Sequence, residues 1–288
     1  MRPALGLGID PSHPLGQRVF ALLTRAHVPH VYERKLGLPY ARVLLVNPSA
    51  LPAMDADLVC VLTPSASSAQ PSLRALEPNS SNSSRVAWLA HGPSMASLNA
   101  RLRLALKTGR FLSSASELAA AYVSEDDVAL AVAASLASDE IPAGFHVIHG
   151  SESLSHRHVV RLASEVWTQP IALEDVALDD LERGLIERGM SAAEARAARD
   201  ADSALLQGGW SAPSDTFARL TGMNPLRLLR YLEEQHLAWS DPALAGAAPA
   251  STTTTSSIPS ASTQVRVVLP PGLAAREVGG VASLRVSA

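Results

Sequence analysis

The sequence predicts an α/β fold in which a parallel sheet is followed by a mainly helical region. Residues 1–150 contain six short apolar runs, each with the length of a buried strand. Residues 151–243 instead carry apolar side chains at helical spacing. Beyond them the chain becomes rich in Ser, Thr and Ala, so residues 244–288 are expected to form a disordered, low-complexity tail. The sequence thus predicts three regions with boundaries at 150 and 243.

The first region begins with a strand, a helix and a second strand. The six strand-like runs are ALGLGI at 4–9, HVYE at 30–33, ARVLLV at 41–46, DLVCVLT at 57–63, RVAWLA at 85–90 and GFHVIHG at 144–150. Between the first two runs, Val19, Leu22, Leu23 and Ala26 fall on one helical face. A strand–helix–strand start implies a right-handed βαβ unit and a Rossmann-like parallel sheet, the plan of a nucleotide-binding fold.

Helix-start and helix-stop signals recur from residue 124 onward. Ser124 is a good N-cap, and three acids follow it in the first helical turn, where they complement the helix dipole. Ser191 with Glu194 forms a capping-box pattern, and the Gly pair at 208–209 marks the end of that helix. Two further helices are expected on either side of Gly222. The region 151–243 is therefore predicted to be mainly helical.

Composition excludes several classes of function. The formal net charge of −3 gives no basic surface for nucleic acid. Cys60 is the only cysteine, so no intrachain disulfide and no cysteine-based metal cage are possible. No apolar stretch approaches the roughly 18 residues of a membrane span, and no signal peptide opens the chain. We expect a cytoplasmic protein with a small-molecule substrate, no nucleic-acid partner and no membrane; its oligomeric state is left open.

The stretch GLGIDPSHPLG at 6–16 is a candidate phosphate-binding turn. Gly6, Gly8 and Gly16 follow or end the first strand, where glycine lets the backbone approach a pyrophosphate at the next helix N-terminus. The spacing is longer than the standard fingerprint, and Asp10 is unfavourable beside a phosphate. Cofactor binding and an ordinary strand–helix turn both remain open.

The charged stretch YERK at 32–35 follows the second strand. An acid at this place, such as Glu33, usually meets the ribose hydroxyls of NAD, whereas Arg34 and Lys35 could pair with the 2′-phosphate of NADP. The two basic residues favour NADP, with NAD as the alternative. Solvated loop charges would give the same pattern.

No catalytic residue can be named from the sequence. His156 and His158 are two positions apart and point to different sides of a helix, unlike a metal-binding pair at i and i+4. The sequence contains no P-loop or nucleophile elbow, and the Tyr-x-x-x-Lys pair of short-chain dehydrogenases is also missing. We therefore predict no metal site and no hydrolase or kinase chemistry.

Residues 121–239 resemble the C-terminal half of NmrA-like atypical short-chain dehydrogenases, in particular the fungal ergot-alkaloid group of festuclavine and agroclavine dehydrogenases. The matching stretches, in order, are AYVSEDDVALAV, FHVIHGSESLSHRHVVRLASEVWTQPI, LERGLIERGMSAAEARAARDAD and FARLTGMNPLRLLRYLEEQHLAW. The resemblance implies an NAD(P)-dependent oxidoreductase of secondary metabolism that reduces an iminium of an alkaloid-type molecule. It also makes residues 151–243 the substrate-side subdomain. The alternatives are a non-catalytic dinucleotide-binding regulator of the same broad family and an inactive relative.

The resemblance is weaker in the N-terminal part. It places Thr63 and Pro64 under the cofactor, at the end of the strand DLVCVLTP, and it puts Gly92 where the family usually has Arg. By the resemblance, the residues that border the substrate pocket are Ser94, Met95 and Asn99. Only about twenty residues separate VLTP from RVAWLA, where the family has a helix, a strand and a further helix. We therefore expect the sheet to lose a central strand beside the nicotinamide.

Overall fold

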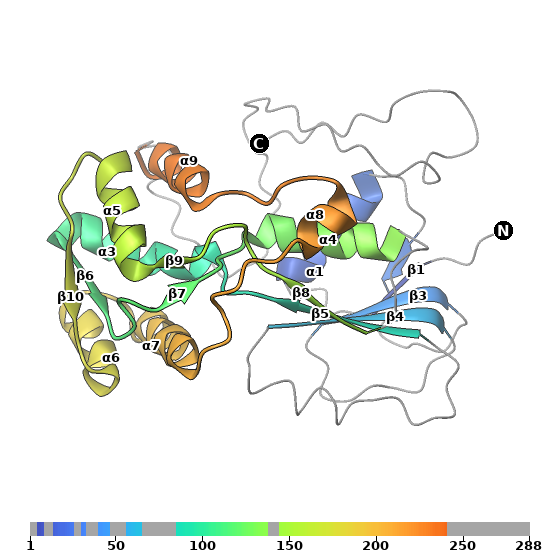
Figure 1. The fold of residues 1–288 in the computed structure, drawn as a ribbon, viewed down its shortest axis with the longest axis horizontal. Helices are drawn as coiled ribbons and strands as arrows, with labels where there is room; N and C mark the ends of the chain where they lie inside the picture. Colours follow the sequence, from blue (N-terminus) through green and yellow to red (C-terminus); the bar gives the residue numbers. More distant parts are fainter. Residues whose placement is uncertain are drawn as a thin grey trace.

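The computed structural model describes residues 5–8, 14–25, 30–32, 40–46, 56–64, 85–137 and 144–240, and these form two lobes (Figure 1). One lobe contains a sheet with helices on it, and the other contains most of the C-terminal helices. The expected tail at 244–288 lies outside the described residues.

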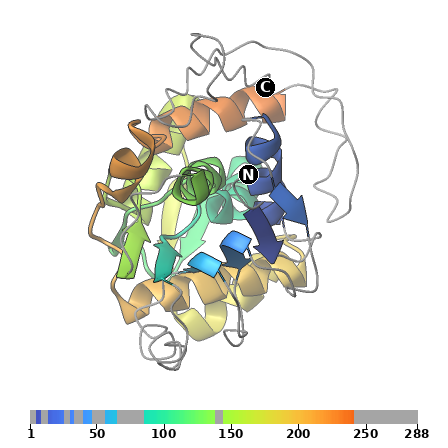
Figure 2. The same cartoon turned by 90° about the vertical axis from the view of Figure 1, so that its right-hand side faces the viewer.

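The first lobe is built on a six-stranded sheet in which every described strand pair is parallel. Its strands, in spatial order, are β2 (His30–Tyr32), β1 (Leu5–Gly8), β3 (Tyr40–Val46), β4 (Ala56–Pro64), β5 (Arg85–His91) and β8 (Gly144–Ile148). Helices α1 (Pro14–Arg25) and α4 (Glu125–Ala137) lie side by side on one face of this sheet (Figures 1 and 2). The α/β fold with a Rossmann-like parallel sheet is therefore confirmed.

The apolar faces predicted for these two helices form the core of this lobe. Val19 and Leu23 of α1 are buried against Val128 and Val132 of α4, and all four belong to one apolar cluster. The N-cap of α4 is as predicted, since the backbone N–H of Asp127 donates to Ser124 Oγ at 3.0 Å. Burying this largely apolar helix against the sheet removes its side chains from water on nearly every side.

The loss of a central strand relative to the family stays a prediction. Strand β4 pairs directly with β5 from Leu58↔Arg85 to Pro64↔His91, so the sheet has no gap between them. The expectation rested on counting the residues between these two strands. β4 pairs with β3 on its other side and β5 pairs with β8, so both strands have hydrogen-bonded neighbours on each side.

The second lobe combines helices with two small sheets. Its elements are η1 (Met95–Leu98), α3 (Asn99–Thr108), β6 (Arg110–Ser113), β7 (Ala119–Ala120), β9 (Leu154–Ser155), α5 (His156–Val166), β10 (Ala172–Asp175), α6 (Leu178–Glu187), α7 (Ala192–Gln207) and α9 (Leu228–Ser240). Residues 95–113 share apolar clusters with residues 159–232 of this lobe. The short helix α8 (Thr216–Thr221) returns to the first lobe, where Phe217 joins its core. The division of the chain at residues 150 and 243 stays a prediction about folding units.

The cap and stop signals of α7 are confirmed. The backbone N–H of Glu194 donates to Ser191 Oγ at 3.3 Å, and the Ser191 hydroxyl donates to the Glu194 carboxylate at 2.6 Å. The helix ends at Gln207, and Gly208 and Gly209 follow with φ of 84° and 90°. Only glycine adopts two successive positive φ values at low cost, so the Gly pair ends the helix.

Four of the chain segments that cross between the lobes are hydrogen-bonded to their neighbours at the crossing. We call them the waist: residues 92–94, 121–124, 149–153 and 208–214. Val123 N donates to Pro93 O at 3.0 Å, and Ala121 N donates to Trp210 O at 2.8 Å. These bonds join segments that are far apart in sequence, so the waist fixes one lobe against the other.

Glycine is required at one point of the waist. A Cβ atom on Gly150 would lie 1.9 Å from the carbonyl oxygen of Tyr122. The two backbones approach so closely there that no side chain fits, and Gly150 N instead donates to Ala121 O at 3.2 Å.

No helix in the described part of the chain is long and apolar enough to cross a membrane.

Candidate functional site at the carboxyl edge of the sheet

The order of the strands marks one place on the sheet as a candidate ligand site. From β1 the chain moves to β2 on one side, then crosses back over β1 to β3 on the other side. Open α/β sheets bind ligands at such a switch point, outside the carboxyl ends of the two strands. Here those ends are Gly8 of β1 and Val46 of β3. The first turn of α1 carries no acidic residue, which favours an anion over a cation near this end of the helix.

The predicted glycines lie at this place in two different elements. Gly6 and Gly8 belong to β1, and Gly8 is its last residue. Gly16 is buried and lies in the first turn of α1 itself, whereas the glycines of β1 precede the helix.

Arg34 and Lys35 lie outside the described residues, so the preference for NADP over NAD that was based on them stays a prediction.

The other predicted residues lie along the same edge. Thr63 and Pro64 are the last two residues of β4, and Ser94 follows β5 in the waist. All strands are parallel, so these positions share the carboxyl edge with Gly8. Met95 is an exception, because it is 1% exposed and packs in the core of the second lobe.

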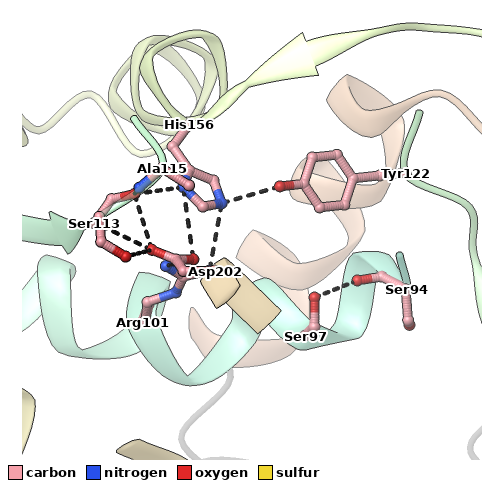
Figure 3. Close-up of polar contacts among 9 residues, drawn as sticks. Ser94, Ser97, Arg101, Ser113, Ala115, Tyr122, His156 and Asp202 are labelled. Atoms are coloured by element: carbon pink, nitrogen blue, oxygen red, sulfur yellow. Dashed lines mark hydrogen bonds and ion pairs between the residues drawn. The ribbon is translucent and has the colours of Figure 1, made fainter. Parts of the chain in front are cut away.

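The side chains of Ser94 and Asn99 are held by local hydrogen bonds. Ser94 Oγ accepts from Ala96 N at 3.1 Å and caps η1, and the Ser97 hydroxyl donates to Ser94 O at 2.6 Å (Figure 3). Asn99 Oδ1 accepts from the Tyr231 hydroxyl of α9 at 3.0 Å. Burial raises the pKa of Tyr231 to about 12, so this hydroxyl keeps its proton at neutral pH. Both residues are thus rigidly placed at the junction of the lobes.

A buried polar network lies behind this junction in the second lobe (Figure 3). Arg101 of α3 donates to Asp202 of α7 at 2.7 Å, and both side chains are at most 1% exposed. The guanidinium carbon of Arg101 also lies 5.0 Å from the ring centre of Phe111. The network is completed by Ser113 at the end of β6, Ser114, Tyr122 and His156 at the start of α5.

The partners of His156 fix its protonation state. Tyr122 Oη lies 2.9 Å and Arg101 Nη2 3.3 Å from Nε2. Arginine can only donate, so Nε2 is the unprotonated nitrogen and Tyr122 donates to it. His156 Nδ1 therefore carries the proton and donates to Ser113 Oγ at 2.7 Å. The Ser113 hydroxyl in turn donates to the Asp202 carboxylate at 3.1 Å. In this chain of hydrogen bonds each group donates to the next, from Tyr122 through His156 and Ser113 to Asp202.

The electrostatics agree with this assignment. Burial and the adjacent Arg101 guanidinium lower the pKa of His156, which keeps the imidazole neutral. Burial acts to raise the pKa of Asp202, but the Arg101 guanidinium and the hydrogen bonds from Ser114 N and Arg101 outweigh it, so the net pKa of Asp202 is lowered. Burial raises the pKa of Tyr122. The network thus holds one arginine cation and one carboxylate anion.

This network fixes the second lobe and does not face a substrate. Arg101, Ser113, Tyr122, His156 and Asp202 are each at most 3% exposed. The sequence analysis missed the network, although one signal was present. Asp202 lies on the buried stripe of α7 together with Ala195, Ala198 and Leu205, and a carboxylate on an apolar stripe requires a buried partner.

The structure shows no metal site in the described residues, where no three His, Cys, Asp or Glu side chains come together. His156 is used in the network, and His158 Nδ1 lies 2.8 Å from Ser155 Oγ. The two histidines therefore do not converge on one point.

Comparison with known proteins was made at three levels. No protein-family model matches the sequence, and no curated protein matches it significantly. The fold is similar to that of an NADPH-dependent quinone oxidoreductase from Escherichia coli, with TM-score 0.68 and 13% identity over 81% of this chain and 99% of that one. It is also similar to Citrobacter sp. triphenylmethane reductase complexed with NADP(H), with TM-score 0.63, 14% identity and coverage of 81% and 99%.

A third similar structure is a nucleoside-diphosphate-sugar epimerase from Staphylococcus aureus, with TM-score 0.61, 13% identity and coverage of 80% and 99%. This chain therefore spans nearly the whole length of all three proteins. At such low identity the likeness concerns the fold, which in this chain is a Rossmann-like sheet joined to a second lobe through a fixed waist.

Proposed function

We propose that this protein is an NADP(H)-dependent reductase whose dinucleotide lies across the carboxyl edge of the sheet. The observation that carries the proposal is the switch point between β1 and β3, with Gly8 at the end of β1 and α1 beginning beyond it. Two of the similar structures were solved with NADPH or NADP(H), and both share the two-lobed fold.

The described residues fit a dinucleotide. Glycine at the end of β1 leaves room for a phosphate near the backbone, and the acid-free first turn of α1 offers its positive end. The ends of β4 and β5 continue the same edge toward the waist, where Ser94 and Asn99 would face the second half of the cofactor and the substrate. When bound, NADPH supplies the hydride; this chain orients donor and acceptor and excludes water.

For the acceptor we propose a protonated imine, as in an alkaloid-type molecule. Hydride addition to the carbon of C=N moves the π electron pair to nitrogen, and this nitrogen already carries its proton. No protein acid is therefore needed, which agrees with the absence of a Tyr-x-x-x-Lys pair from the sequence. The same absence favours a second candidate, a regulator that binds the dinucleotide without turning it over.

Binding is tested by thermal melts of the full chain with saturating NADPH, NADH or neither. A ligand that binds only the folded state at 100 times its Kd stabilises it by about 2.7 kcal/mol. We expect a higher midpoint with NADPH than with NADH. A cooperative melt that neither nucleotide shifts would contradict the proposal.

Turnover separates the two candidates. NADPH absorbance is followed with 3,4-dihydroisoquinoline, menadione and a triphenylmethane dye as acceptors. We expect the cyclic imine to be reduced fastest. A shifted melt together with no oxidation by any acceptor would favour the regulator.

A further inference from the structure

A further segment crosses between the lobes outside the waist. Helix α8 packs in the core of the first lobe through Phe217, whereas α9 packs in the core of the second lobe through Leu228 and Leu232. Residues 222–227 join these two helices, and we call them the strap (Figure 1). The strap therefore connects one apolar core to the other.

Two carboxylates hold the strap where it meets α9. Asp127 Oδ2, in the first turn of α4, accepts from Leu226 N at 2.8 Å. Glu152 of the waist accepts from the Arg227 guanidinium at 2.6 and 3.0 Å and from Leu228 N at 3.3 Å. The backbone N–H groups at the start of a helix have no acceptor within the helix itself, and here other elements supply the acceptors. The start of α9 is thus bonded both to the first lobe and to the waist.

The two carboxylates differ in their surroundings. Glu152 is paired with Arg227, whereas the half-buried Asp127 makes no ion pair with any residue that the structure describes. Burial raises the pKa of Asp127, and the hydrogen bonds from Leu226 and Ser124 act in the opposite direction. Hydrogen bonds to an ionised acceptor are stronger than those between neutral groups. The bond to Leu226 is therefore the main interaction between this carboxylate and the strap.

One turn into α9, Tyr231 lies at the boundary between the lobes. Its hydroxyl donates to Asn99 Oδ1 at 3.0 Å, so the orientation of the Asn99 side chain depends on the position of α9. After burial and the bond to Asn99, the charges that act on the pKa of Tyr231 are those of Glu125, Arg18 and Asp126, all in the first lobe. The environment of Tyr231 therefore reports how α9 sits against the first lobe.

We propose that Asp127 is a positioning residue of the reductase site: through Leu226 it holds α9 against the first lobe and so places Tyr231 and Asn99 relative to the dinucleotide. The inference rests on the proposed function, in which the first lobe binds the dinucleotide and Asn99 faces the substrate. A displacement of about 1 Å can lower the rate of such a reaction about 100-fold. Asp127 itself touches neither the dinucleotide nor the acceptor and acts only through α9.

The inference is tested by 19F NMR on the full chain labelled with 3-fluorotyrosine, without nucleotide. The Tyr231 signal is identified by its loss in Tyr231→Phe. We expect Asp127→Ala to move this signal, because Leu226 N loses its acceptor and the start of α9 shifts. Asp127→Asn is equally uncharged but keeps an oxygen that can accept, so it should leave the signal near its original position. The control is Asp215→Ala, which removes an exposed carboxylate whose partner Arg219 lies on α8, and it should not move the signal.

Two NMR outcomes would overturn the inference: an unmoved Tyr231 signal in Asp127→Ala, or the same movement in Asp127→Ala and Asp127→Asn. This arm needs neither nucleotide nor acceptor. It therefore decides whether Asp127 positions α9 even if the melts show no NADPH binding.

If turnover is observed, kinetics below the melting midpoint of every variant give a second test. Asp127→Ala should lower kcat with dihydroisoquinoline about tenfold or more and leave KM for NADPH unchanged, because the dinucleotide lobe is intact. Asp127→Asn should restore most of the rate. The double variant Asp127→Ala with Tyr231→Phe should be no slower than Tyr231→Phe alone, since Asp127 acts through α9 and Tyr231. Losses that multiply in the double variant, or a raised KM for NADPH with unchanged kcat, would contradict a positioning role.

Discussion

The pair Arg101 and Asp202 shows how two isolated residues acquire a structural role. Each lies on the buried stripe of its own helix. Burying either charge without the other would cost more free energy than the fold could supply. Together, with hydrogen bonds from Ser113 and Ser114 to the carboxylate, they form a charge-balanced network in the middle of the second lobe. No local pattern pairs two residues that are 101 positions apart, so the sequence could show only that each needed a partner.

We predict that Asp202→Ala destabilises the protein by about 3–5 kcal/mol, because it leaves the Arg101 charge buried and unpaired. The double variant Arg101→Met with Asp202→Leu should recover part of the loss. Urea unfolding followed by circular dichroism measures the free energy of unfolding of the single and the double variant. As a control, Glu165→Ala removes an exposed partner of Arg161 and should leave the midpoint nearly unchanged. Equal effects of Asp202→Ala and Glu165→Ala would contradict the buried-charge account.

The two neutral histidines predict a pH dependence of stability. Burial lowers the pKa of both His149 and His156 below the ordinary value of 6.5. As the pH falls below 6.5 the unfolded chain therefore takes up protons that the folded chain does not, and the free energy of unfolding decreases. Each histidine contributes at most about 1.4 kcal/mol per pH unit.

Urea midpoints between pH 7.5 and pH 5.5 measure this dependence. The stability should fall toward pH 5.5, and His149→Phe should show a shallower fall than the unmodified chain. A stability that is flat or that rises on acidification would show that the histidines are not held neutral. The lowered pKa of Asp202 acts in a separate and more acidic range.

At the scale of elements, the sequence predicted most of what local chemistry decides. The strands, the start of α4 at Ser124 and the ends of α7 were all found near their predicted positions. Caps, turn glycines and periodicity act within a few residues, so one sequence contains them fully. The crossings of the waist were not predictable, because their hydrogen bonds join segments whose proximity depends on the whole fold.

We predict that Gly150→Ala damages the waist more than any ordinary glycine substitution. Its methyl group would lie 1.9 Å from the backbone carbonyl of Tyr122, and backbone cannot move aside as a flexible side chain can. The loss should exceed about 3 kcal/mol or prevent cooperative unfolding. The control is Gly189→Ala, where φ is +97° but no atom lies within 4 Å, and the cost should be about 1–2 kcal/mol. Similar midpoints for both variants would mean that the waist is not tightly packed.

At the scale of the whole molecule, strand order was the feature that the sequence could not supply. The residue count between β4 and β5 predicts a strand fewer than in the family, and hydrogen bonding places these two strands side by side in a continuous sheet. Strand order also locates the switch point between β1 and β3, to which the glycine spacing alone pointed only weakly. The proposed dinucleotide site therefore rests on topology more than on any motif.

The proposed dinucleotide site at the switch point is tested most directly by the rise in melting midpoint that NADPH causes. This rise is measured for the unmodified full chain and for the variants Gly8→Gln and Gly8→Glu. Gly8 ends β1 at the switch point, and the two substituents have nearly the same size but differ in charge. We predict a clear rise for the unmodified chain, a smaller rise for Gly8→Gln and little or none for Gly8→Glu, because a carboxylate there repels the phosphates. Equal rises in all three proteins, or no rise in the unmodified chain, would contradict a dinucleotide site at the switch point.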